Sequence, residues 1–384
     1  MKTGILLPRS STHPLISYNF MDGIHTFLKH RGLSNEIECI TASIGYGTDT
    51  ALIQQEAERL ILEHRVDLLV IFADYPVVEC LFPVVTSLNK LLIIVNHGAK
   101  YPPSWAASPN VIHHSLNNAS NCWLTGKLAA KENKSAALVS SFYDGGYSIT
   151  HAIAASFMDD SGQIAFNFVG HQQKEQFNTK PLISFLKTKP EVDSLLATLS
   201  GELGPELYLQ LREQAADKNL KLYACPVLLE ESLYEGNLNP EESIAVSGYT
   251  SWFKASEEEE NQAYCQTFKK ETNREPDSFG VLGWDTGLML KTILEISEDK
   301  ALDAKTIVQH PDLQKLRGAK GEMRLHAYTQ HYISPVHYLH SGVGKEVSKH
   351  HDLSLEMVEA SFNELINFEI QGPSSQWLNT YLCS

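Results

Sequence analysis

The sequence predicts an α/β fold of two lobes, each built around a parallel β-sheet. Three observations support this prediction: short apolar runs that end in small or polar residues, segments of helical periodicity after them, and a restart of the pattern in mid-chain. The apolar runs of the N-terminal third are 4–7, 37–44, 68–73 and 91–95. A strand that is apolar on both faces needs helices on both faces, which is typical of parallel sheets.

Three helices are predicted between these runs. Residues 15–29 place Phe20 and Ile24 on one face, and 49–64 has a similar apolar stripe. Pro76 is expected to start the third helix, because proline fits the first helical turn. In parallel sheets ligands bind beyond the carboxyl ends of the strands, so the small polar residues there are the first candidates for a binding site.

The pattern restarts near residue 136 and predicts the second lobe. The expected strands are 136–140, 163–168, 194–198, 221–224 and 244–247. The expected helices are 121–133, 148–159, 180–187, 205–218, 257–272 and 279–297. Ser256 and Glu259 form a capping-box pattern for the helix at 257, and we expect the acidic run 257–260 to be a solvated first turn.

Composition excludes several classes of protein. The 384 residues suggest two or three domains, and 43% hydrophobic with 20% charged content is ordinary for a globular protein. A formal charge of −15 argues against nucleic acid as a partner. No apolar stretch approaches the roughly 18 residues of a membrane span. We therefore expect neither nucleic-acid binding nor membrane insertion.

Cysteine and histidine usage gives no metal or redox motif. The six cysteines are scattered without a CxxC pair, which excludes a zinc ribbon and does not predict a disulfide scaffold. The histidine pairs are His113 with His114, His337 with His340, and His350 with His351. No HExxH motif accompanies them, so we expect surface histidines, no metal site and no cofactor.

The runs in this order resemble the type I periplasmic binding proteins, in the branch that binds branched-chain amino acids and amides. Residues 4–8 resemble the opening strand of that family and 51–73 the segment that leads into its third strand. Residues 136–147 resemble its second-lobe strand and tyrosine turn, and 279–287 its late helix. The resemblance covers roughly residues 2–338.

This resemblance implies two Rossmann-like lobes that are joined by three crossover segments and close on a small polar ligand. The crossovers, which would act as hinges, are expected near 116–120, 248–251 and 327–335. Lobe 1 would combine 1–116 with 250–326. Lobe 2 would combine 121–247 with 335–384, including a C-terminal extension. In that extension, 354–367 has an amphipathic pattern that could dock a partner or, as we favour, pack on its own lobe.

The candidate ligand-binding residues follow the predicted strands and crossovers. They are Ser10, Ser11, Asp74, Tyr75, His97, Gly98, Ala99, Tyr147, Gly201, Glu202, Tyr249 and Asp285. Asp74 stands near the position of the family's carboxylate-binding serines, where it would repel a carboxylate and suit an amine or hydroxyl donor. Tyr147 matches the family's tyrosine, although Ser148 replaces the following glycine.

Some of these residues have a purely structural alternative. Ser10 or Ser11 could cap a helix, and Glu202 could simply be exposed. Tyr249 and the nearby Trp252 could belong to the core, and Asp285 could cap local structure, which we favour.

The resemblance predicts a binding protein without catalytic activity. It would capture an amino acid, amide or related amine for an ABC transporter permease, as a monomer or weak dimer. A ligand-sensing regulatory protein and, less favoured, an enzyme on this fold are the alternatives; no GxSxG, GxxxxGK or GxGxxG motif supports catalysis. Since the first strand is expected near Thr3, we predict no signal peptide. The location would be periplasmic if a leader was removed, and otherwise cytoplasmic.

Overall fold

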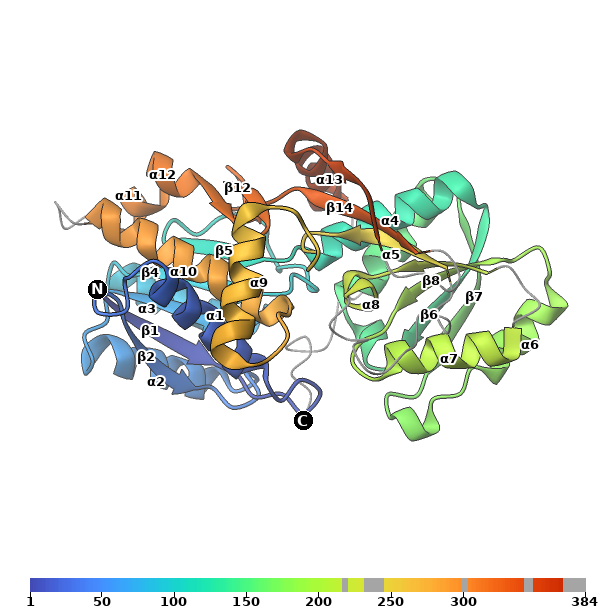
Figure 1. The fold of residues 1–384 in the computed structure, drawn as a ribbon, viewed down its shortest axis with the longest axis horizontal. Helices are drawn as coiled ribbons and strands as arrows, with labels where there is room; N and C mark the ends of the chain where they lie inside the picture. Colours follow the sequence, from blue (N-terminus) through green and yellow to red (C-terminus); the bar gives the residue numbers. More distant parts are fainter. Residues whose placement is uncertain (216–219, 231–244, 298–302, 342–347, 369–384) are drawn as a thin grey trace. The chain divides into compact units, whose positions relative to one another are not determined.

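A computed structural model of the chain describes residues 1–215, 220–230, 245–297, 303–341 and 348–368. The chain divides into two compact units (Figure 1). Unit 1 holds Met1–Leu116 and Lys254–Pro335, and unit 2 holds Asn117–Phe253 and the described residues after Pro335. The chain passes from one unit to the other after Leu116, Phe253 and Pro335; the role of these segments as hinges stays a prediction.

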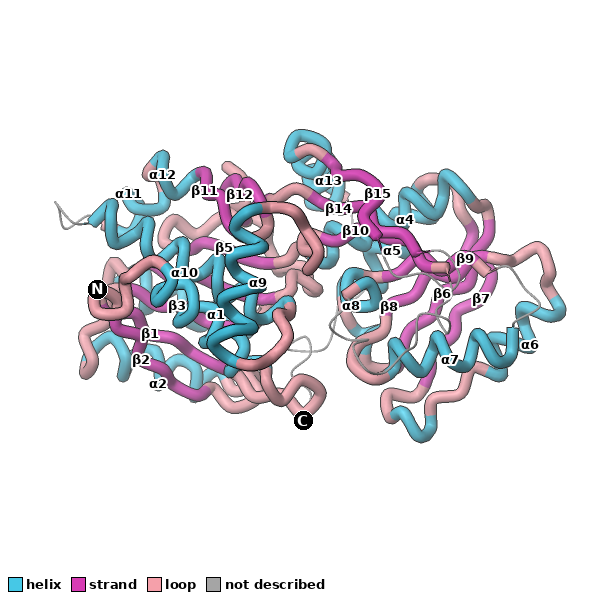
Figure 2. Tube along the Cα trace, viewed as in Figure 1, coloured by secondary structure: helices cyan, strands magenta, loops and turns pink. Residues whose placement is uncertain are grey.

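Unit 1 is built on a five-stranded parallel sheet of order β2-β1-β3-β4-β5 (Figure 2). Its strands are β1 (Lys2–Leu7), β2 (Glu38–Ser43), β3 (Leu68–Phe72), β4 (Leu91–Asn96) and β5 (Val111–Ser115). Its helices are α1 (Ile16–His30), α2 (Thr50–Leu62), α3 (Phe82–Ser87), α9 (Glu259–Thr272), α10 (Ser278–Ser297), α11 (Ala304–Val308) and α12 (Pro311–Gln314). A small antiparallel sheet adds β11 (Lys315–Gly318), β12 (Gly321–Leu325) and β13 (Tyr332–Ile333).

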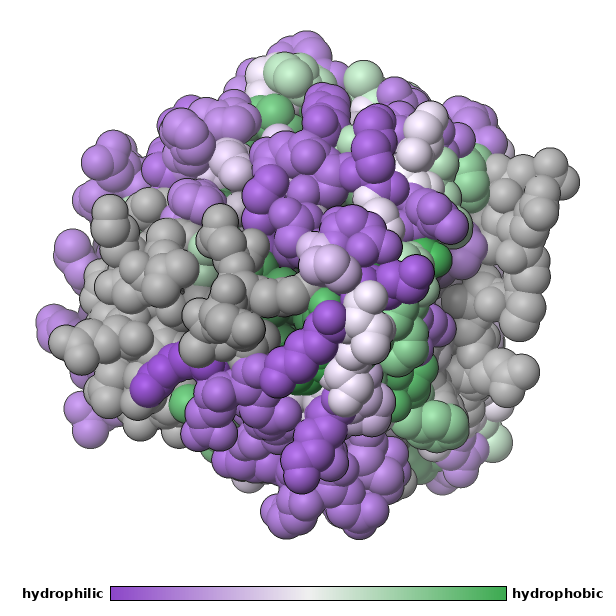
Figure 3. Space-filling view, turned by 90° about the vertical axis from the view of Figure 1, so that its right-hand side faces the viewer, coloured by the Kyte–Doolittle hydropathy of each residue, from purple (hydrophilic) through white to green (hydrophobic). Residues whose placement is uncertain are grey.

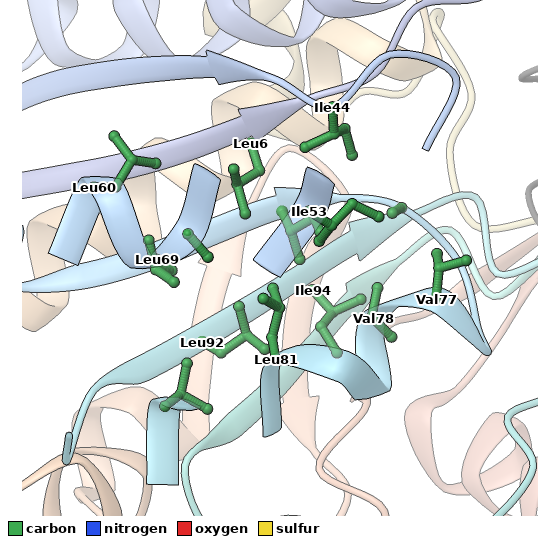
Figure 4. Packing of buried hydrophobic residues seen from close by; sticks show 14 of the residues in the cluster. Leu6, Ile44, Ile53, Leu60, Leu69, Val77, Val78, Leu81, Leu92 and Ile94 are labelled. Carbon is green, nitrogen blue, oxygen red and sulfur yellow. The ribbon is translucent and has the colours of Figure 1, made fainter. Parts of the chain in front are cut away.

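One face of this sheet packs against α2 and the 3-10 helix η1 (Val77–Leu81) (Figure 4). Leu6, Leu69 and Leu92 point from three neighbouring strands into the same cluster as Ile53 of α2 and Leu81 of η1. All five residues of β3 are buried. The prediction of strands covered on both faces is therefore confirmed for β3, whereas β2, at the edge of the sheet, has only one fully buried residue.

Helices α1 and α10 approach each other through glycines. A Cβ atom at Gly283 would collide with the backbone carbonyl of Phe20, and one at Gly23 would collide with the carbonyl of Gly280. A Cβ at Gly287 would meet the ring of Phe27. This contact accounts for the glycine pattern of residues 279–287 as a packing requirement.

We predict that Gly283→Ala destabilises unit 1 by about 1–3 kcal/mol. The new methyl group would meet backbone atoms of α1, which cannot move aside as the end of a flexible side chain could. Urea denaturation followed by circular dichroism would measure the loss. Lys291→Ala, on the partly exposed face of the same helix, is the control. An equal midpoint for Gly283→Ala and wild type would contradict the close contact.

Unit 2 contains a seven-stranded mixed sheet of order β15-β14-β10-β9-β8-β6-β7. Its strands are β6 (Ser135–Ser141), β7 (Gln163–Gly170), β8 (Ser194–Thr198), β9 (Lys221–Ala224), β10 (Val246–Thr250), β14 (Val336–Ser341) and β15 (Ser348–Leu353). Its helices are α4 (Asn118–Glu132), α5 (Ser148–Asp159), α6 (Lys180–Thr188), α7 (Leu203–Ala215), α8 (Pro226–Leu229) and α13 (Leu355–Asn367), with short 3-10 helices η2 (Asp144–Gly146) and η3 (Lys174–Gln176). The strands from β10 to β7 pair in parallel, and β14 and β15 pair antiparallel.

The C-terminal helix α13 packs on its own unit, as we favoured. Lys127 of α4 forms an ion pair with Glu364, and the ring of Phe368 meets Trp123 edge-on at 4.9 Å between centroids.

On the face shown in Figure 3, hydrophilic residues cover most of the described surface beside a narrow hydrophobic band. Among the described residues, every helix is too short or too polar to span a lipid bilayer.

Several local predictions were wrong. Pro76 precedes the 3-10 helix η1, so the α-helix α3 starts only at Phe82. Helix α9 starts at Glu259, and its N-cap is Glu258 rather than Ser256, so no capping box forms. The acidic run is also not simply solvated, because Glu258 pairs with Arg317 at 2.7 Å and Glu260 pairs with Arg31.

The boundaries of the predicted lobes differ in places from those of the units. Residues 250–253, expected in lobe 1, belong to unit 2, because Thr250 is the last residue of β10. Three predicted features lie outside the described residues: the strand start at 244, the helix end at 218 and residues 369–384 of the C-terminal extension. Strands β5, β11, β12, β13, β14 and β15 were not predicted.

Candidate functional site

The turn after β1 carries Ser10 and Ser11. The hydroxyl of Ser10 accepts a hydrogen bond from the backbone N–H of His13 at 2.9 Å, and Ser11 is exposed. Helix α1 has Leu15 as its N-cap without a side-chain cap, so neither serine caps it. Ser10 therefore shapes the turn, and Ser11 is left accessible at the carboxyl end of β1.

Asp74 and Tyr75 follow β3 and are both buried. Asp74 is 4% exposed and interacts electrostatically with Lys100, whose pKa is lowered by burial while the carboxylate opposes that shift. The hydroxyl of Tyr75 forms a hydrogen bond of 3.1 Å with Nε2 of His113, and burial raises the pKa of the Tyr75 hydroxyl. Asp74 and Lys100 thus place a buried negative charge and a partly buried positive charge near this strand end.

The turn after β4 contains His97, Gly98 and Ala99. The side chain of Asn96 holds it from both sides: Nδ2 donates to the carbonyl of Ala73 at 3.1 Å, and Oδ1 accepts from the N–H of Gly98 at 2.8 Å. Gly98 has a φ of 67°, a conformation that glycine adopts readily, and Ala99 is fully buried. The turn is therefore fixed by the strand that precedes it.

The His97 ring belongs to an aromatic group at this strand end. It stacks on Phe279, the second residue of α10, with centroids 4.6 Å apart, and His13 meets the same phenylalanine edge-on at 5.3 Å. Burial lowers the pKa of His97 to about 3 and that of His13 to about 4. Both imidazoles are neutral at pH 7 and act as polar aromatic rings.

The prediction of surface histidines was wrong for three of the six. His113 and His114 lie in the fully buried strand β5, and His337 is 5% exposed beside Asp352, with Nδ1 and Oδ1 at 2.7 Å. His113 stacks on His331 with centroids 4.1 Å apart. Among the described residues no three His, Cys, Asp or Glu side chains gather in a way that could hold a metal ion.

The histidines whose pKa is lowered by burial, His113, His114 and His331, make stability depend on pH. Burial lowers the pKa of His331 to about 4 from the ordinary 6.5, so below about pH 6.5 the unfolded chain takes up a proton that the folded chain does not. We predict a loss of about 1.4 kcal/mol per pH unit for each such histidine between pH 6.5 and 4. Urea unfolding between pH 7.5 and 4.5 would measure it.

In the same experiment His331→Phe keeps a ring beside His113 but cannot take up a proton. The free energy of unfolding should then fall less steeply with decreasing pH, by the contribution of one histidine. His25→Phe, at an exposed position of α1, is the control for replacing a histidine by phenylalanine. Equal slopes for wild type and His331→Phe would contradict a neutral buried ring.

Three of the candidate residues in unit 2, Tyr147, Gly201 and Glu202, lie beyond β6 and β8. Tyr147 is 1% exposed and meets Tyr143 edge-on at 5.4 Å. Gly201 has a φ of 59°, and Glu202 next to it is exposed, in agreement with its structural alternative. The two strands are neighbours in the sheet, so these turns share one edge.

Tyr249 lies in the core of unit 2, in agreement with its structural alternative. It is 8% exposed within β10, and its ring lies 5.4 Å from that of Tyr338 on the neighbouring strand. Its N–H donates to the hydroxyl of Thr125 on α4 at 3.1 Å. Trp252, 5% exposed, is buried as well.

Asp285 is a fully buried carboxylate of α10 that holds the small sheet of unit 1. Oδ1 accepts a hydrogen bond from the N–H of Ala319 at 2.7 Å. Burial raises its pKa to about 6, and the charge of Lys320 opposes the shift. Lys320 is 2% exposed and donates to the carbonyl of Ser115 at 2.7 Å. This arrangement agrees with the structural alternative for Asp285.

We predict that Lys320→Met lowers stability by about 3–5 kcal/mol at pH 7, because it leaves the Asp285 carboxylate buried without its cation. Since the pKa of Asp285 is about 6, the loss should be smaller at pH 5, where the carboxyl group is protonated. Urea unfolding at both pH values, with Lys315→Met on the exposed surface as control, would measure the difference. The same loss at both values would contradict the pairing.

A surface cavity of about 380 Å³ lies elsewhere in unit 1. It is lined by Thr292, Glu295, Ile296, His310, Asp312 and Lys315. These residues come from the last turns of α10 and the start of α12 and β11, whereas Phe279 beside His97 is near the first residue of α10. None of the candidate ligand-binding residues lines this cavity.

Comparison with known proteins decides the family. A family model described as periplasmic binding protein matches residues 29–339. The chain belongs to this family. The predicted resemblance to type I periplasmic binding proteins and the predicted fold class are confirmed. Comparison with curated protein sequences gives no significant match.

Solved structures of this family share the fold at low sequence identity. A substrate-binding protein of an ABC transporter from Sphaerobacter thermophilus has a TM-score of 0.78 at 13% identity, over 92% of this chain and 97% of that one. A solute-binding protein from Rhodopseudomonas palustris, in complex with 3,4-dihydroxybenzoic acid, has a TM-score of 0.74 at 16% identity, over 92% of this chain and 97% of that one. The branched-chain amino acid binding protein LivJ from Streptococcus pneumoniae, in complex with isoleucine, has a TM-score of 0.65 at 13% identity, over 91% of this chain and 99% of that one.

Sequence reasoning selected several strand ends correctly as places where polar groups gather but missed two groups there. It did not select Asp144, which begins η2 after β6, or Lys100, which follows the turn after β4. The signal for Asp144 was available: it lies three residues before Tyr147, in a turn with two glycines. A carboxylate just beyond a parallel strand is a strand-end candidate by the same rule that selected Asp74.

Proposed function

We propose that this periplasmic binding protein captures a small polar solute and delivers it to an ABC transporter. The observation that carries the proposal is the concentration of polar side chains and positive-φ glycines at the carboxyl ends of the parallel strands in both units. Asp74, His97 and Gly98 provide it in unit 1, and Tyr147 and Gly201 provide it in unit 2. This is the edge at which open α/β sheets bind ligands.

Asp74 supports an amino acid, an amide or a related amine as the solute. A carboxylate that is 4% exposed gains from any donor or cation that approaches it, because it has lost most of its water. The charge of Lys100 balances it in part, which suits a ligand that carries both a donor and an acceptor. A zwitterionic or amide-bearing solute has both.

A second candidate is an aromatic acid. The neutral rings of His97 and Phe279 form an aromatic group at the same edge, and Lys100 supplies a cation for a carboxylate. The Rhodopseudomonas palustris proteins of this fold were solved with benzoate, 4-hydroxybenzoate and 3,4-dihydroxybenzoic acid. The two solute classes differ in whether a ligand amine should be needed for binding.

The periplasmic location and the permease partner belong to this proposal and follow from the family. A sensing role through another protein partner is the alternative in which the same solute binds but no permease takes it. The structural relatives described above are binding proteins, and we propose no reaction for this chain.

We would screen amino acids, amides, polyamines and benzoates by thermal shift against wild type, Asp74→Asn and Asp67→Asn. A solute at 100 times its Kd should stabilise wild type by about 2.7 kcal/mol. We expect hits among amine-bearing solutes that are lost in Asp74→Asn. Asp67 and Asp74 flank the same strand β3 at opposite ends, and Asp67 is exposed, so Asp67→Asn controls for the loss of one charge.

Hits limited to benzoates and strengthened by Asp74→Asn would favour the aromatic acid and reject the amine. A solute that stabilises all three proteins equally would show that it binds away from the end of β3. Absence of any hit across the four classes would count against solute capture.

A further inference from the structure

Asp144 is a buried carboxylate at the carboxyl edge of unit 2. It follows β6 as the first residue of η2 and is 1% exposed. Among the described residues no lysine, arginine or histidine forms an ion pair with it, and its partners are hydroxyl and amide groups. A buried charge of this kind needs an account, because removing a carboxylate from water is costly.

Its two oxygen atoms join the ends of two neighbouring strands. Oδ2 accepts from the hydroxyl of Ser141, the last residue of β6, at 2.6 Å. Oδ1 accepts from the hydroxyl of Ser200, beyond β8, at 2.7 Å, and the N–H of Ser200 lies 3.3 Å from Oδ2. Since β6 and β8 pair in parallel, the carboxylate bridges two turns that lie side by side at the sheet edge.

The backbone of Asp144 extends this connection to α5. Its carbonyl accepts from the hydroxyl of Thr150 at 3.0 Å and from the N–H of Tyr147 at 3.1 Å. The Thr150 hydroxyl lies 2.6 Å from that of Thr198, the last residue of β8. One residue thus links the turn that carries Tyr147 with the turn that carries Gly201.

We propose that Asp144 is the positioning residue of the solute site in unit 2, which holds Tyr147 and Gly201 in one arrangement without touching the solute. The inference rests on the proposed function in taking these two residues as solute contacts. The connection between the turns is a property of the protein alone and can be measured without a solute.

Electrostatics separates this role from simple stabilisation. Burial raises the pKa of Asp144 above its usual value, although the hydrogen bonds from Ser141 and Ser200 oppose the shift. A carboxyl group with a raised folded pKa holds its proton more tightly in the folded chain, so its ionised form lowers stability at pH 7. Stability alone does not account for an aspartate here.

Asparagine has the same shape but a different set of donors. Its amide NH₂ takes the place of one carboxylate oxygen and can only donate, so the serine hydroxyl that it faces must act as the acceptor. Neutral hydrogen bonds then replace the stronger charge-assisted ones between the two turns. Asp144→Asn should therefore preserve the fold while weakening the link between the turns.

The test is hydrogen–deuterium exchange of the full chain at pH 7, followed by mass spectrometry, for wild type, Asp144→Asn and Asp144→Ala. We expect at least tenfold faster exchange in residues 142–147 and 199–202 together, with the strand β8 unchanged. The melting temperature of Asp144→Asn should equal or exceed that of wild type. Asp159→Asn, an exposed aspartate at the end of α5, is the control.

Faster exchange confined to 142–147 would overturn the proposal, because Asp144 would then serve its own turn alone. Faster exchange throughout unit 2 with a lower melting temperature would show a general structural role and overturn it as well. Because no solute enters the measurement, either result leaves the solute screen to be judged separately. If Asp144→Ala fails to fold, Asp144→Asn still decides the outcome.

Discussion

The structure depends on parallel strands that are buried on both faces. Every residue of β3, β5 and β8 is buried, so these strands have no exposed face on which to place polar groups. Polar side chains therefore collect where the strands end, and helices must approach both faces closely. The first consequence places Asp74 and Asp144 at sheet edges, and the second requires glycine where α1 crosses α10.

The same constraint explains which elements the sequence could reveal. The strand at 194–198 and the helix at 148–159 were predicted with the observed bounds, because their apolar runs and periods are uninterrupted. Strand β5 was missed because His113 and His114 look polar, although the strand is fully buried. Strand β15 was missed because a partner strand, rather than an apolar run, defines it.

The candidate site was predictable as a location and less so as a set of contacts. Strand-end position alone selected Asp74 and His97. It could not show that His97 stacks on Phe279, which comes from a distant part of the chain. Asp144 escaped because its partner Ser200 follows a different strand, and the pairing becomes visible only once β6 and β8 are known to be neighbours.

Three buried carboxylates of this chain differ in the groups that compensate their charge. Asp285 interacts with Lys320 inside unit 1, so the pair contributes little net charge and serves the fold. Asp74 is balanced in part by Lys100, which is only partly buried. Asp144 is stabilised by hydroxyl and amide dipoles, which orient a charge without cancelling it. The carboxylates at the sheet edges therefore keep more of their field than the carboxylate in the interior, and a solute at either edge would sense that field.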